Sequence, residues 1–69
     1  GIVEIDFECI NGGRYEIYDI QGLFVDGNDL SSAANNIVTI DISDYPNGIY
    51  FLNLYCGRNL RTYKIMKEG

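Results

Sequence analysis

The sequence predicts an all-β fold, a small immunoglobulin-like antiparallel β-sandwich of about seven strands. Apolar and polar residues alternate with a period of two, turn-forming residues recur about every 8–12 positions, and no segment joins a helical period to a capping residue. The chain has 69 residues, of which 46% are hydrophobic, which is typical of a folded domain. We therefore expect a single domain over residues 1–69 with a small core.

The first half of the chain predicts three strands. Residues 3–9 alternate apolar odd positions with acidic even positions, as a half-buried strand does. The Asn-Gly-Gly run at residues 11–13 then predicts a tight hairpin turn into a strand at residues 15–18. A turn follows in which Gly22 takes a positive φ, and residues 23–25 form a short strand. Residues 26–36 are rich in Gly, Asn, Asp and Ser and predict a loop, with room for a short strand or turn around Leu30.

The second half predicts three further strands. Residues 37–42 are rich in β-branched side chains, and residues 43–48 form a turn in which Pro46 fixes φ and Gly48 allows the reversal. Residues 49–56 carry no charge, which predicts a central strand covered on both faces. A hairpin at residues 57–59 leads to the last strand at residues 60–67. The predicted core consists of Ile5, Phe7, Ile17, Ile40, Ile42, Tyr50, Leu52 and Leu54.

The charges are unevenly distributed. The net charge of −5 argues against nucleic acid as a partner. Residues 1–44 carry nine carboxylates and one cation, whereas residues 45–69 carry four cations and one carboxylate. Two interpretations stay open: acidic and basic strands pair across the sheet, or the basic terminal strand is recognised by a partner. No apolar run reaches the roughly 18 residues of a membrane span, so we expect no membrane insertion.

The two cysteines leave two interpretations open. Cys9 and Cys56 match no zinc-binding spacing, and the chain has no His to complete a metal site. Both fall on the apolar face of a predicted strand, where a free Cys acts as a small hydrophobe. They form one disulfide only if they lie opposite each other.

The sequence offers no catalytic constellation and predicts no cofactor. His is absent, so neither a general base near neutral pH nor a partner for a cysteine nucleophile is present. Residues 26–29 (Asp-Gly-Asn-Asp) are rich in oxygen ligands but lack the length and terminal Glu of an EF-hand loop, so a polar loop is the favoured interpretation. The six Tyr residues could present a sugar-binding platform, but without Trp their packing in strands is favoured.

Three sequence blocks resemble a known family. They read YEIYDIQG at residues 15–22, IDISDYPNGIY at residues 40–50 and KIMK at residues 64–67. Their order and spacing are similar to those of the type A C-terminal sorting domain of the type IX (Por) secretion system. The chain departs from the family pattern by lacking the PNP motif, by Tyr45 where Leu is usual, by Leu23 where a basic residue is common, and by Glu68-Gly69 after the basic ending.

The resemblance implies a non-catalytic signal that directs a longer parent protein through the periplasm and across the outer membrane to the cell surface or the medium. It implies three partners: the type IX translocon, a shuttle protein and a sortase-like peptidase. Carried onto this chain, recognition falls on Gly48, Tyr50, Lys64, Ile65 and Lys67, and structural turns on Gly22, Pro46 and Gly48. We expect the terminal strand to be recognised through main-chain pairing along its edge, with the Lys side chains setting the register. The alternative is an immunoglobulin-like accessory or carbohydrate-binding module of a larger surface enzyme.

Overall fold

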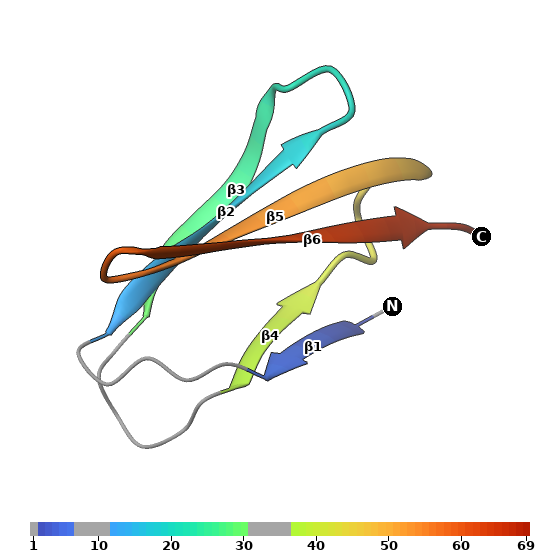
Figure 1. Ribbon diagram of the computed structural model, residues 1–69. Helices are drawn as coiled ribbons and strands as arrows, with labels where there is room; N and C mark the ends of the chain where they lie inside the picture. Colours follow the sequence, from blue (N-terminus) through green and yellow to red (C-terminus); the bar gives the residue numbers. More distant parts are fainter. Residues whose placement is uncertain (1, 7–11, 31–36) are drawn as a thin grey trace.

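The computed structural model describes residues 2–6, 12–30 and 37–69, and these residues form six strands and no helix (Figure 1). The all-β prediction is confirmed, with six strands in the described ranges rather than about seven. The strands are β1 (Ile2–Asp6), β2 (Gly13–Asp19), β3 (Phe24–Leu30), β4 (Ile37–Asp41), β5 (Gly48–Cys56) and β6 (Asn59–Lys67).

Two antiparallel sheets make up the sandwich. The larger sheet has the order β3-β2-β5-β6, and the smaller one pairs β1 with β4 (Figure 1). The hairpin predicted at residues 11–13 is therefore wrong, because β1 and β2 belong to different sheets. Residue 11 itself lies outside the described residues. Outside β3, the period-two pattern correctly located the strands, but it carries no information about which strands pair.

One layer of apolar side chains fills the space between the sheets. Ile17 of β2 and Leu52 of β5 are cross-strand neighbours, and both are 0% exposed. The remaining buried side chains are Ile5, Ile40, Ile42, Tyr50, Leu54 and Ile65. Seven of the eight predicted core residues are confirmed, and Phe7 lies outside the described residues. Ile65, which had been assigned to recognition, joins the core because it is the cross-strand neighbour of Tyr50.

The strand β5 is central in its sheet but covered on one face. Its burial alternates, with Tyr50, Leu52 and Leu54 buried and the residues between them half-buried. The expectation that β5 is covered on both faces is wrong, because the described chain supplies only the β1–β4 pair as a second layer. The outer face instead stays open, and it carries Phe24, 59% exposed, and Met66, 58% exposed.

The strand β3 is longer than predicted, because it extends from the predicted short strand into the predicted loop. It runs from Phe24 to Leu30 and, among the described strands, pairs with β2 alone, with a register shift between Ile17 and Tyr18. Polar residues 26, 28 and 29 suggested a loop, but an edge strand tolerates such residues because half of its backbone groups face solvent. The oxygen-rich run at residues 26–29 is thus part of a strand rather than a loop.

The second cysteine is oxidised. Cys56 ends β5 and is disulfide-bonded. The sequence has one other cysteine, Cys9, which lies outside the described residues. The interpretation of Cys56 as a free apolar side chain is therefore wrong.

A pair of neighbouring substitutions on β5 tests the one-sided core. Leu52→Ala should lower the free energy of unfolding by about 2–5 kcal/mol, because it leaves a cavity in the buried layer. Phe51→Ala, on the open face, should cost less than half as much. Urea denaturation followed by circular dichroism measures both. Equal losses would show that the outer face is also a packed core.

Candidate functional site

The three sequence blocks meet at one end of the sandwich. Asp19, near the end of the first block, is the cross-strand neighbour of Tyr50 in the second. Tyr50 in turn pairs with Ile65, and Gly48 with Lys67, so the second block lies beside the third. Figure 1 shows the β2–β3 turn, the start of β5 and the end of β6 gathered at this end. We call it the motif end.

Tyr50 fixes the chain where it enters β5. Its ring is 5% exposed and packs at 5.2 Å between centroids against the ring of Tyr45. Its hydroxyl donates a hydrogen bond of 2.5 Å to the carbonyl oxygen of Pro46. The ring and the hydroxyl together hold residues 45–46 against the start of β5, so Tyr50 positions the motif end rather than presenting a surface.

Two glycines provide backbone conformations that side chains disfavour. Gly22 has φ +85° and its N–H donates to the carbonyl of Asp19 at 2.9 Å, while the Asp19 carboxylate accepts the N–H groups of Gln21 and Leu23. This confirms the positive φ predicted for Gly22. Gly48 has φ +153°, a region that other residues rarely adopt. Space around both glycines is free, so backbone strain alone would oppose a side chain there.

A shallow hollow of about 370 Å³ lies between the β2–β3 turn and the segment leading into β5. Its walls are mostly apolar and come from two places: residues 19–21 with Val25, and residues 46–50. The one carboxylate on its wall, that of Asp19, is occupied by the two backbone N–H groups of its own turn. The hollow therefore offers packing space and no unpartnered charged group.

The strand β6 forms an open edge of the larger sheet. All nine of its residues pair with β5, and no described strand lies on its other side. The two-residue turn at Gly57 and Arg58 makes Cys56–Asn59 a hydrogen-bonded pair, and such pairs alternate along an antiparallel ladder. The backbone N–H and C=O groups directed away from β5 therefore belong to Leu60, Thr62, Lys64 and Met66. We call this row the β6 edge.

At the opposite edge of the same sheet, side chains of β3 already bond the outward backbone N–H groups. On β3 the N–H of Gly27 donates to the Asp26 carboxylate at 2.8 Å, and the N–H of Asp29 donates to the Asn28 side-chain oxygen at 2.9 Å. Both N–H groups face away from β2, so they are the ones an added strand would need. No comparable bond covers the outward groups of β6 within the described residues. The two edges therefore differ in their capacity to accept a strand.

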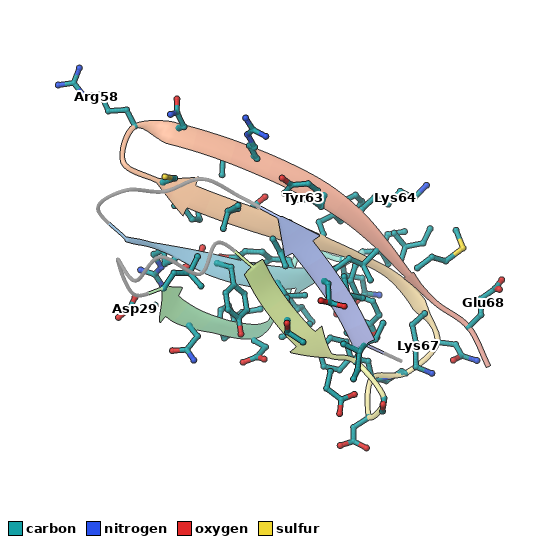
Figure 2. The ribbon with its side chains drawn as sticks, turned by 90° about the horizontal axis from the view of Figure 1, so that it is seen from below. Asp29, Arg58, Tyr63, Lys64, Lys67 and Glu68 are labelled. Carbon is teal, nitrogen blue, oxygen red and sulfur yellow. The ribbon has the colours of Figure 1, made fainter. Side chains whose placement is uncertain are left out.

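The β6 strand is also basic. Arg61 and Lys67 share the core side of the strand with the buried Ile65, and Lys64 projects on the outer face. Figure 2 shows Lys64 and Lys67 pointing to different sides of β6. In the described residues the one ion pair is Arg14–Glu16 on β2, at 2.8 Å. The interpretation that acidic and basic strands pair across the sheet is wrong, because the neighbour of β6 is the uncharged β5. The β6 cations are left without carboxylate partners in the described part of the chain.

The structure thus divides the residues assigned to recognition. Lys64 and Lys67 lie on the exposed strand, and Gly48 pairs with Lys67 at its end. Tyr50 and Ile65 are cross-strand neighbours buried on the core face of the same two strands. The sequence analysis missed the contrast between the two edges. The signal that could have found it is the Asp26 and Asn28 side chains, each of which precedes an outward N–H group.

Neither a metal cluster nor a single aromatic platform is present among the described residues. No three His, Cys, Asp or Glu side chains among them gather into a possible metal site, and they contain no helix long and apolar enough to cross a membrane. The tyrosines do not form one platform: Tyr50 is buried in the core, whereas Tyr18 lies on the outer face and meets Phe24 edge to face at 79°. Perpendicular rings are unsuited to stacking along a sugar.

Two tyrosines at the motif end should respond differently to loss of the hydroxyl. Tyr50→Phe should destabilise the fold by about 1 kcal/mol because it removes the hydrogen bond to Pro46. The Tyr45 hydroxyl is enclosed without a hydrogen-bond partner among the described residues, so Tyr45→Phe should leave stability unchanged or raise it by up to about 1 kcal/mol. Thermal unfolding measures both, and a loss in Tyr45→Phe as large as that in Tyr50→Phe would contradict this assignment.

The pH dependence of the same variant gives a second measurement. Burial, and next the nearby Asp26 carboxylate, raise the pKa of Tyr45 in the folded state. Because the folded pKa lies above the unfolded value of about 10, this contribution is present below pH 10 and is lost as the pH rises through the folded pKa. Tyr45→Phe should therefore lose less stability than the parent chain above pH 10.

Comparison with known proteins adds the family. The family model described as the secretion system C-terminal sorting domain matches residues 1–68. Searches of the curated proteins and of the solved structures returned no match. The family is a non-catalytic sorting signal that the type IX secretion system recognises, and its members are exported to the cell surface or the extracellular space. The chain belongs to the C-terminal sorting domains of type IX secretion.

Proposed function

We propose that residues 1–69 form a single domain at the C-terminus of a longer protein, which it directs across the outer membrane and to attachment at the cell surface. The domain itself carries no catalytic activity. The observation that carries this proposal is the β6 edge: an exposed strand bearing three cations without carboxylate partners in the described chain, in a member of a sorting-signal family.

The residues have distinct roles in this proposal. Lys64 and Lys67 contact the secretion machinery, and the backbone of β6 provides the surface on which they are presented. Gly48, Tyr50 and Ile65 act indirectly: Gly48 permits the chain to enter β5, and Tyr50 and Ile65 are cross-strand neighbours on the buried face of the sheet. Gly22 and Pro46 shape the turns at the motif end.

The partners follow from the family in the same way. We propose that the domain passes through the periplasm and meets the type IX translocon, a shuttle protein and then a sortase-like peptidase that removes it. A periplasmic stage agrees with the oxidised state of Cys56, since disulfides persist in that compartment.

A secretion assay tests the role of β6. The domain is fused behind a reporter that carries its own signal peptide, in a host that has the type IX machinery. The full-length fusion should reach the surface or the medium, and deletion of residues 63–69 should retain the reporter in the periplasm. Normal export of the deletion variant would contradict the sorting role of β6 and favour the accessory-module interpretation.

A charge variant separates recognition from folding. Lys64→Ala with Lys67→Ala removes two cations and keeps the backbone edge, and we expect about tenfold less export, from two contacts of up to about 1 kcal/mol each. Arg58→Ala is the matched control, because Arg58 lies in the β5–β6 turn at the far end of the hairpin (Figure 2). Equal export by the double variant and the control would exclude a role for the two lysines.

A further inference from the structure

We propose that the segment of the secretion machinery that binds β6 is an extended acidic strand, with a carboxylate at about every third position, that joins the sheet along the β6 edge. This inference rests on the proposed function of β6 and specifies the chemistry of its partner. Two independent features of the strand support it: the free backbone groups of its edge and the spacing of its cations.

The first feature is the backbone. Strand addition needs a row of unpaired N–H and C=O groups, and β6 directs those of Leu60, Thr62, Lys64 and Met66 away from β5. Four consecutive outward positions match the length of an ordinary strand of about five to seven residues. On β3 the outward N–H groups of residues 27 and 29 are already bonded to side chains. A strand therefore has one favourable edge on this sheet.

The second feature is the spacing of the cations. Arg61, Lys64 and Lys67 are three residues apart, so consecutive cations project on opposite faces of the strand. A partner strand in register meets each of them only if its own carboxylates are also spaced by three. Between the cations, β6 presents the side chains of Tyr63 and Met66. These favour apolar or β-branched residues at the facing positions of the partner strand. The expected partner strand therefore carries its carboxylates alternately on its two faces.

A second copy of this chain does not meet these requirements. Two β6 strands paired antiparallel about Lys64 would oppose Lys64 with Lys64 and Arg61 with Lys67, which is repulsive. The β3 strand of another copy carries Asp26 and Asp29 at a spacing of three, but its outward N–H groups are occupied. The β1 strand carries acidic residues two positions apart, which does not match a spacing of three. A strand from another protein fits better.

Designed peptides test the proposal on the 69-residue domain. The acidic probe is a capped nine-residue peptide with Glu at every third position and Val and Thr between. Matched probes replace Glu by Gln or by Lys. A fourth probe keeps Glu but is N-methylated at alternate residues, which removes the peptide N–H groups that would bond to the β6 edge. Nuclear magnetic resonance titration gives the affinity of each probe, and amide hydrogen exchange shows where it binds.

We expect the acidic peptide to protect the amides of Leu60, Thr62, Lys64 and Met66. Three cross-strand charge pairs should make it bind about 3-fold to 100-fold more tightly than the Gln peptide, and added salt should reduce this preference. The Lys peptide and the N-methylated peptide should not protect the edge. In the domain, Lys64→Gln should reduce the preference for Glu over Gln, and Arg58→Gln should leave it unchanged.

The following outcomes would overturn the proposal. Equal affinity for the Glu and Gln peptides removes the charge requirement, and binding of the N-methylated peptide removes the main-chain pairing. Shifts confined to the outer face around Phe24, or protection of β6 that grows with domain concentration alone, assign the surface to a different contact or to a second copy. None of these results affects the secretion assay, so the role of β6 in sorting can stand while the acidic strand fails.

Discussion

The pairing of β5 with a strand on each side is the constraint on which the rest of this structure depends. Leu52 is fully buried only because Ile17 of β2 is its neighbour and the β1–β4 pair covers the same face. The two-residue turn after Cys56 then places β6 on the free side of β5. In the described chain no further strand follows, so the last strand occupies an edge. Its exposure results directly from the way the core is built.

Exposed edges are normally a liability, because unpaired backbone groups invite aggregation. This sheet deals with its two edges differently. Asp26 and Asn28 bond the outward N–H groups of β3, whereas β6 keeps its outward groups free and carries three cations along it. Like charges discourage pairing between identical strands. The cations therefore suit an edge that is kept for one kind of partner and closed to copies of itself.

Much of this arrangement could be predicted from the sequence, and particular residues show where prediction stopped. Alternation identified Ile5, Ile17 and Leu52 as core residues, and Gly22 was correctly assigned a positive φ. Pairing was not predictable, since the alternation in β1 is the same whether its neighbour is β2 or β4. Composition was misleading for β3, where polar side chains satisfy an edge instead of forming a loop. The charge-free β5 was equally misleading, because its uncharged outer face is left uncovered by the described strands.

The candidate site was predicted in part. The KIMK block pointed to the last strand, but Ile65 proved to be a core residue and Arg61 joined the cations of the edge. A list of motif residues cannot separate side chains that hold a strand in place from those that it presents, because both are fixed by the same backbone. Burial makes that separation: Tyr50 and Ile65 are buried on the core face of the sheet, and Lys64 lies on its exposed side.

Site-specific photo-crosslinking during export tests most directly whether the β6 edge is the surface that the secretion machinery contacts. A photoreactive amino acid is placed at Thr62 on β6 or at Asn28 on β3, two exposed positions on opposite edges of the sheet. Both fusions are first shown to be exported. We predict crosslinks to components of the type IX machinery from position 62 and none from position 28. Crosslinks from position 28 alone would contradict the account.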